Sequence, residues 1–443
     1  MRVSWTDLGK QRADKADGKR VEITGFALGA NSWGGQDRFL LMAEPSCCEG
    51  CVPNNPLAVV EVFARRPMKI ASGALRLGGT WQVSFDADGW RYRLHDAEMV
   101  AGVTRRALLA ASPLFCLPVP AMAQPTDGMA VDLHSHAGNL TRLSYGSGGS
   151  VPVAEPMRQG GVSVISLAVV SDSPIIKLTA GRLRPSRDPH PGELYTFSQR
   201  AFPALHALAL EQGMPIVRTS AELRAARSSR PSIIVASEGA DFLEGRIERL
   251  DEAYQRWALR HLQLTHYRPN ELGDIQTEPS VHEGLTAFGA EVIRRCNALG
   301  IVVDVAHGTF ELVKKAAAVT TRPLVLSHTS LISRPASWTR RILPDHAKAI
   351  AGTGGVIGIW PVAAYFPNIV SYATEGFARM VDVVGIDHVG LGTDQLGLVG
   401  ASAMPSYTDL PQLAAALRTK FNAEETAKLL GGNFRRVFEA SIG

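Results

Sequence analysis

Apolar runs alternate with helix-compatible segments along the last two thirds of the chain. Such runs, rich in β-branched and aliphatic residues, are typical of strands that are buried on both faces. Amphipathic segments of helical period separate several of the runs, for example Ala287 to Leu299 and Phe310 to Val319. The pattern therefore predicts an α/β fold, a closed (β/α)8 TIM barrel over residues 128–443. The eight runs span residues 130–136, 162–170, 232–239, 261–266, 301–307, 324–328, 355–360 and 388–394.

The first hundred residues follow a different pattern. Short alternating runs at 20–24, 58–63 and 80–85 are separated by clusters of Gly, Asn, Asp and Pro. They predict a small, mostly-β domain over residues 1–100, either a barrel or a sandwich. Its Cys48 and Cys51 form a Cys-x-x-Cys pair, which is half of a structural zinc site or part of a plain loop.

Residues 101–127 resemble an export signal that lies inside the chain. Arg105 and Arg106 precede a short apolar stretch, and Ala121-Met122-Ala123 has the small-residue pattern of a cleavage site. The stretch is too short and too rich in Pro to cross a bilayer as a helix, so no integral membrane segment is expected. If the signal is used, the barrel is exported to the periplasm; otherwise the chain is cytoplasmic. The alternatives are a fusion of two reading frames, a translation start near Met99 or Val103, or a plain linker.

Composition narrows the classes of function. The chain has 443 residues, 45% of them hydrophobic, and a net charge of +4 from 46 basic and 42 acidic residues. This near-even balance, without any basic block interleaved with aromatic residues, gives no indication of nucleic-acid binding. A small-molecule substrate is the expected partner, and a homodimer is one option for assembly.

Residues that bind metals or transfer protons stand at the ends of six predicted strands. In a (β/α)8 barrel the carboxyl ends of the strands meet at one mouth, where active sites are built. Side chains from distant parts of the sequence are therefore expected in one pocket. The six residues are His136, Glu238, His266, His307, His328 and Asp394.

This set of side chains predicts a metal centre. His134 and His136 are two residues apart on one strand, so both side chains point to the same face. Imidazole and carboxylate ligands suit Zn²⁺, with Mn²⁺, Fe²⁺ or Co²⁺ as alternatives. Four histidines and one glutamate predict two ions bridged by Glu238, with His307 and His328 as further ligands.

Several motifs resemble the membrane (renal) dipeptidase family of zinc metallopeptidases over residues 130–440. They occur in the order of that family and extend beyond the strand ends. They are Leu264-Thr265-His266, Gly284-Leu285-Thr286, Asn297-Ala298-Leu299-Gly300, Ser327-His328-Thr329-Ser330, Arg340-Arg341-Ile342-Leu343-Pro344-Asp345, His388 to Asp394, and Gly431-Gly432-Asn433-Phe434.

The resemblance implies a dipeptidase that cleaves its substrate through a water held between two zinc ions. The resemblance also implies that His266 stabilises the oxyanion and that Arg341 holds the free carboxylate of the dipeptide. Asp394 takes a proton from the water and delivers it to the leaving amine. Glu238 is the bridging ligand in this reading.

One departure from the family keeps other functions open. The family commonly has His-x-Asp on the first strand, whereas this chain has His134-Ser135-His136. His-x-His on the first strand is also the pattern of the wider amidohydrolase superfamily. An amidohydrolase that acts on another amide, a lactone or an N-acyl amino acid is therefore the alternative enzyme. A catalytically silent barrel that binds a metal or a ligand is the alternative from another class.

Overall fold

The computed structural model describes residues 2–9, 12–28, 36–43, 59–68, 74–83, 92–100, 128–146, 149–179, 182–398 and 400–442. They divide into two compact units, one that contains residues 2–100 and one that contains residues 128–398 and 402–442. The export-signal-like segment and the Cys48–Cys51 pair of the sequence prediction lie outside the described residues.

The first unit contains a closed five-stranded barrel with the strand order β1-β2-β3-β5-β4. β3 and β5 run parallel, and the other neighbouring strands run antiparallel. Its core includes Trp81 and Tyr92, whose rings stack with centroids 5.3 Å apart. The predicted β-domain is thus a barrel, although β2 and β5 have no counterpart among the predicted strands. The elements are α1 (Trp5–Gly9), β1 (Arg20–Leu28), β2 (Gln36–Met42), β3 (Val59–Met68), β4 (Ala74–Val83) and β5 (Tyr92–Met99).

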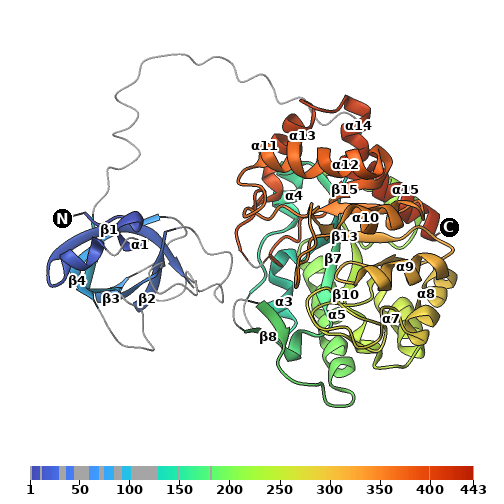
Figure 1. Cartoon of the computed structure of the whole chain (residues 1–443), viewed down its shortest axis with the longest axis horizontal. Helices are drawn as coiled ribbons and strands as arrows, with labels where there is room; N and C mark the ends of the chain where they lie inside the picture. Colours follow the sequence, from blue (N-terminus) through green and yellow to red (C-terminus); the bar gives the residue numbers. More distant parts are fainter. Residues whose placement is uncertain are drawn as a thin grey trace. The chain divides into compact units, whose positions relative to one another are not determined.

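The second unit is a closed barrel of eight parallel strands, which confirms the predicted (β/α)8 fold (Figure 1). Each of the eight predicted runs overlaps a barrel strand, and the order around the barrel is β10-β11-β12-β13-β14-β15-β6-β7. The strands are β6 (Ala130–Ser135), β7 (Val162–Val170), β10 (Ser232–Glu238), β11 (Leu259–Gln263), β12 (Val302–Asp304), β13 (Val325–Thr329), β14 (Val356–Ile359) and β15 (Val389–Leu391). A separate two-stranded sheet is formed by β8 (Ile176–Thr179) and β9 (Arg182–Pro185).

Helices surround the barrel, and the two amphipathic segments named from the sequence are α8 and α9 with unchanged bounds. The apolar face of α8 buries Val292, Ile293 and Cys296, and Thr286 caps its first turn. The helices are α3 (Leu140–Leu143), α4 (Ala154–Gly160), α5 (Glu193–Glu211), α6 (Ser220–Ala225), α7 (Glu248–Trp257), α8 (Ala287–Leu299), α9 (Phe310–Val319), α10 (Pro344–Ala351), α11 (Ile369–Ser371), α12 (Ala378–Val384), α13 (Leu410–Leu417), α14 (Ala423–Ala427) and α15 (Asn433–Ile442).

The amino-terminal end of the barrel is closed by an apolar layer. Phe434 and Phe438 of α15 pack with Val131, Val302 and other residues near the starts of the strands. This end is filled mainly with hydrophobic side chains, and the metal-binding and proton-transferring residues predicted from the sequence lie at the opposite end.

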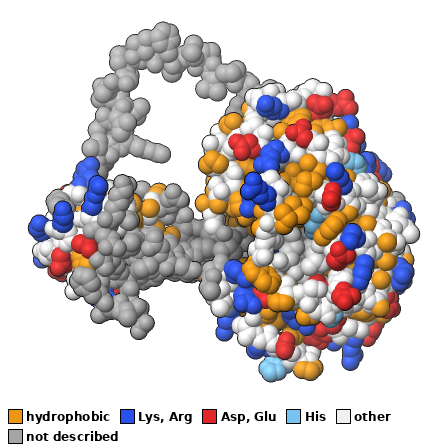
Figure 2. Space-filling view, in the orientation of Figure 1, with side chains coloured by type: hydrophobic (Ala, Val, Ile, Leu, Met, Phe, Trp, Pro, Cys, Tyr) orange, Lys and Arg blue, Asp and Glu red, His pale blue; other side chains and the backbone are white. Residues whose placement is uncertain are grey.

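The outer surface of the barrel unit carries acidic and basic side chains that are interspersed on the face shown in Figure 2. This mixture agrees with the near-even charge balance of the sequence. Among the described helices, none combines the length and the apolar character needed to cross a membrane.

Candidate metal centre

The carboxyl ends of the strands bring seven predicted site residues into one buried cluster. Three of them lie within strands, at His134 on β6, Glu238 at the end of β10 and His328 on β13. The others stand on the first residues after a strand. Each of the seven residues is at most 6% exposed. They are His134, His136, Glu238, His266, His307, His328 and Asp394.

Three strands, β11, β12 and β15, end three residues before the predicted apolar runs do. β12 and β15 stop three residues before His307 and Asp394, respectively. These two residues adopt positive φ values of 68° and 50°, which a strand cannot accommodate. Backbone strain of this kind costs free energy and persists where the surrounding structure holds it, as it commonly does in active sites.

Glu238 lies at the centre of the cluster and uses both carboxylate oxygens. Its Oε1 faces the Nε2 atoms of His307 at 3.1 Å, His134 at 3.4 Å and His328 at 3.5 Å. Its Oε2 faces Nε2 of His136 at 3.1 Å and of His266 at 3.3 Å. Burial alone would raise the pKa of Glu238, but the surrounding histidines hold it well below its usual range.

Hydrogen bonds at Nδ1 orient the rings of His136 and His328. Nδ1 of His136 lies 3.0 Å from the carbonyl oxygen of Ala168, and Nδ1 of His328 lies 2.9 Å from Oγ of Ser327. A carbonyl oxygen can only accept, so Nδ1 of His136 donates this bond and its Nε2 is the ring nitrogen turned toward the cluster. This outer hydrogen bond is the arrangement that metal-binding histidines use.

The donor set fits divalent metal ions. Ligand atoms about 2.0–2.1 Å from a tetrahedral Zn²⁺ lie about 3.3 Å from one another. The Nε2 atoms of His134 and His136 are 3.1 Å apart, and those of His307 and His328 are 3.2 Å apart. Together with the distances to Glu238, these spacings suit two ligand groups that share one carboxylate. Candidate ligand sets include His134 with Glu238 and His328, and Glu238 with His266 and His307.

Asp394 stands at the edge of the cluster. Its Oδ1 lies 3.4 Å from Nε2 of His136 and has no hydrogen-bond partner among the described residues. Burial raises the pKa of Asp394. Gly397 packs so closely that a Cβ there would lie 2.0 Å from Oδ1 of Asp394 and 2.3 Å from Cδ2 of His136.

His266 is held by a carboxylate that the sequence interpretation did not include. Its Nδ1 lies 2.6 Å from Oδ1 of Asp172, and the backbone N–H of Tyr267 donates to the other oxygen of Asp172 at 3.0 Å. Burial would lower the pKa of His266, but Asp172 and Glu238 raise it to about 9. Asp172 follows β7 by two residues, so the strand-end rule that selected the other residues applies to it as well.

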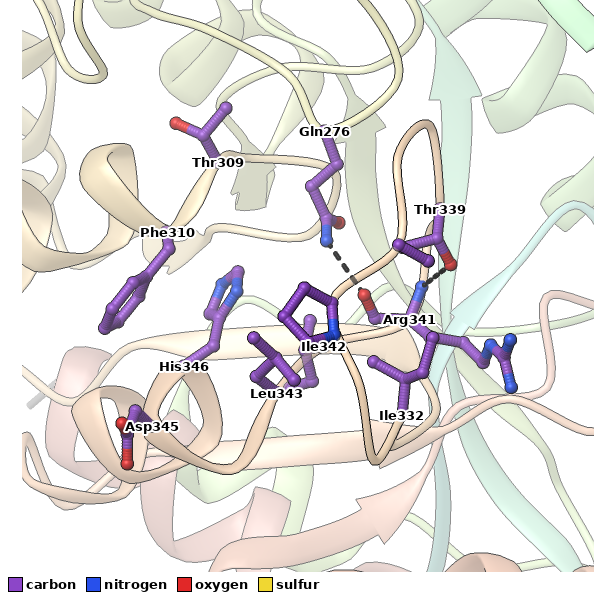
Figure 3. Close-up of a pocket in the computed structure, with 12 residues that line it drawn as sticks. Gln276, Thr309, Phe310, Ile332, Thr339, Arg341, Ile342, Leu343, Asp345 and His346 are labelled. Carbon is purple, nitrogen blue, oxygen red and sulfur yellow. Dashed lines mark hydrogen bonds between the residues drawn. The ribbon is translucent and has the colours of Figure 1, made fainter.

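Arg341, the residue expected to hold a carboxylate, does not join the cluster. Its guanidinium lies over the ring of Tyr365, 4.6 Å from the centroid, and in Figure 3 it points away from His346. The neighbouring Arg340 points into the site instead. Its Nη2 lies 3.1 Å from Nε2 of His328, and only 7% of the residue is exposed.

These features define a (β/α)8 barrel with a carboxylate-centred candidate metal site at its mouth. The membrane dipeptidase family (Peptidase family M19) matches residues 194–441, which is more than half of the chain. The chain therefore belongs to this family, as the motifs of the sequence predicted.

Curated relatives carry dipeptidase names. Dipeptidase tcpJ of Claviceps purpurea (strain 20.1) is 27% identical over 228 residues, which cover 48% of this chain and 52% of the relative. Dipeptidase verJ of Clonostachys rogersoniana is 27% identical over 233 residues, which cover 51% and 59%. The chain thus spans little more than half the length of these relatives.

Solved structures show the same fold. A metallopeptidase from Rhodobacter sphaeroides, bound to a phosphinate mimic of the dipeptide L-Ala-D-Ala, is similar with a TM-score of 0.61 and 22% identity. That similarity covers 71% of this chain and 100% of the other. An amidohydrolase from Pseudomonas aeruginosa is similar with a TM-score of 0.56 and 19% identity, over 72% and 97% of the two chains.

Proposed function

We propose that the chain is a metal-dependent dipeptidase that hydrolyses the amide bond of dipeptides. The observation that carries the proposal is the buried carboxylate of Glu238, which faces imidazole nitrogens on both of its oxygens. An isolated buried charge of this kind is costly, and metal coordination is one way in which proteins compensate for it.

In this proposal Glu238 would help to hold two divalent ions, most simply Zn²⁺. His134 and His136 complete one ligand group, and His307 and His328 complete the other. When bound, such ions polarise a carbonyl and make a water molecule nucleophilic near neutral pH.

The remaining side chains supply the proton transfer and the electrostatic stabilisation. Asp394 has a raised pKa and an unpartnered Oδ1, so it suits a group that takes a proton from the attacking water and gives it to the leaving amine. His266 turns Nε2 toward the centre while Asp172 holds Nδ1, so it can donate a hydrogen bond to the developing oxyanion.

Arg340 rather than Arg341 is proposed to bind the carboxylate of the dipeptide. Its guanidinium is buried beside His328, and no carboxylate in the described part of the chain comes within ion-pair distance of it. A guanidinium binds a carboxylate through two parallel hydrogen bonds, so a substrate with a free C-terminus would supply the missing negative charge.

The His134–His136 pair favours a second candidate. The imidazole of His136 replaces the carboxylate, and its negative charge, that the family commonly has at this position. The wider amidohydrolase superfamily also has His-x-His on the first strand. That alternative is an amidohydrolase acting on another amide, a lactone or an N-acyl amino acid. Substrates without a free carboxylate would then be cleaved as well as dipeptides.

A hydrolysis assay tests the proposal. The purified chain is incubated with a panel of dipeptides and with the same dipeptides as C-terminal amides, before and after chelation and zinc replacement. We expect chelator-sensitive, zinc-restored cleavage that strongly favours the free acids. Equal cleavage of acids and amides would favour the second candidate, and absence of cleavage with metal bound would reject the dipeptidase.

A further inference from the structure

A short segment at residues 275–278, here called the strap, connects the metal centre with the arginine loop at residues 330–341. The strap is tied to the metal centre through its backbone. The N–H of Gln276 donates to the carbonyl oxygen of His307 at 2.8 Å, and Ile275 forms an antiparallel bridge with Gly308. Any displacement of the strap relative to His307 must therefore break main-chain hydrogen bonds.

The far end of the strap is anchored by the β8–β9 hairpin. Arg184 donates to both carboxylate oxygens of Glu278, from Nε and Nη2, each at 2.6 Å. Arg182 donates to the carbonyl oxygen of Thr277. Bidentate pairs between arginine and carboxylate fix geometry as well as charge. The backbone of the strap is thus held from both sides.

The side chain of Gln276 uses both ends of its amide on the arginine loop. Its Oε1 accepts a hydrogen bond from Nη1 of Arg340 at 2.9 Å. Its Nε2 donates to the carbonyl oxygen of Arg341 at 3.2 Å, the contact drawn in Figure 3. Only two hydrogen bonds therefore separate the carbonyl of a candidate metal ligand from the buried guanidinium.

The neutral charge of Gln276 has a consequence for binding. An amide oxygen accepts a hydrogen bond from a guanidinium but does not neutralise it. Nε of Arg340 is buried and has no partner among the residues that the structure describes, so the guanidinium keeps both donor capacity and charge for an incoming anion. A carboxylate in place of the amide would hold Arg340 equally well, but it would neutralise the guanidinium and compete with the carboxylate of the substrate.

We propose that Gln276 is a positioning residue that holds the Arg340 guanidinium at a set distance from the metal centre. The inference rests on the proposed function, because it treats Arg340 as the group that binds the C-terminal carboxylate. A fixed distance between the reacting carbonyl and the carboxylate selects substrates with one residue after the cleaved bond. Gln276 would then contribute to the preference for dipeptides over longer peptides.

Three variants test this role. Gln276→Met keeps the length of the side chain and removes both hydrogen bonds, and a neighbouring cavity of about 290 Å³ leaves room for it (Figure 3). Gln276→Glu keeps the acceptor and adds a competing charge. Glu278→Gln is the matched control, because it weakens the same strap on the side that faces Arg184.

The expected readout is a split between KM and kcat. Gln276→Met should raise KM for dipeptides about tenfold, the effect of losing one hydrogen bond to a charged group, with kcat and metal content nearly unchanged. Gln276→Glu should raise KM further, since its carboxylate competes with the substrate. Glu278→Gln should leave KM within about twofold of the wild type, because the amide oxygen still accepts from Arg184 and the main-chain bond of Gln276 to His307 is untouched.

Other results would overturn the inference. A fall in kcat at unchanged KM, or an equal effect of Gln276→Met and Glu278→Gln, would give Gln276 only a structural role. An unaltered ratio of dipeptide to tripeptide cleavage in Gln276→Met would remove its part in specificity. Failure of the proposed function is a different result, because the wild-type chain loaded with metal would then cleave no dipeptide at all.

Discussion

Gly397→Ala places a single methyl group against the proposed proton-transfer residue. Gly397 donates its N–H to the carbonyl oxygen of Asp394 at 2.9 Å, and the two residues form a tight turn at the barrel mouth. The added Cβ would lie 2.0 Å from Oδ1 of Asp394 and 2.3 Å from Cδ2 of His136. Both distances are below 3.0 Å, so both side chains must move if the backbone stays in place.

The size of the effect follows from that distance. Ordinary van der Waals contact begins at 3.4 Å, so a Cβ that lies 2.0 Å from Oδ1 of Asp394 forces a retreat of 3.4 − 2.0 = 1.4 Å if the backbone stays in place. A displacement of about 1 Å in a catalytic group costs on the order of 10²-fold in rate. We therefore expect Gly397→Ala to lower kcat about 100-fold, which corresponds to about 2.7 kcal/mol.

The assay is steady-state hydrolysis of a dipeptide by zinc-loaded enzyme, with the metal content of each preparation measured in parallel. Gly149→Ala is the matched control, because a Cβ at Gly149 meets no atom of the described residues within 4 Å. The control should keep wild-type kcat. If Gly397→Ala keeps kcat within about threefold at full metal content, Asp394 does not act from the position described.

Further predictions concern the carboxylate site, the oxyanion site and acid stability. Arg340→Met should raise KM for dipeptides about 100-fold while Arg341→Met stays within about threefold, and the reverse order in steady-state kinetics would restore the sequence expectation. Asp172→Asn should lower kcat about 10²-fold with metal content unchanged, because an amide has one accepting oxygen and no charge, and so cannot serve both Nδ1 of His266 and the N–H of Tyr267 as the carboxylate does; a loss of metal instead would make His266 chiefly a ligand. Burial lowers the pKa of His346 to about 4 from 6.5. Between these pH values the folded state binds fewer protons than the unfolded state. The free energy of unfolding therefore decreases, by up to about 3 kcal/mol, as the pH is lowered from 6.5 to 4. Urea unfolding should show that this loss disappears in His346→Phe.

The barrel was accessible from the sequence because its signals are local. Each strand is a short apolar run, and its last polar residue marks the mouth, so periodicity alone located His307 and Asp394. The exact strand ends were not accessible in the same way. The positive φ of both residues depends on the packing around them, and nothing in the residue types themselves required it.

Residues that act through contacts across the barrel were harder to find. Arg340 and Arg341 are adjacent and chemically identical, so only the path of their loop decides which one enters the site. Gln276 lies in a loop without a motif, and its role follows from hydrogen bonds to His307 and Arg340 that no spacing predicts. Asp172 did carry a signal, since it stands just past the end of β7.

The most direct test of a carboxylate-bridged centre is the metal content of purified protein, measured by elemental analysis for the wild type and three variants. We predict two divalent ions per wild-type chain, about one in His134→Ala and in His307→Ala, and less than one in Glu238→Ala because both ions share that carboxylate. A wild-type chain without bound metal, or a Glu238→Ala variant that retains two ions, would contradict the account.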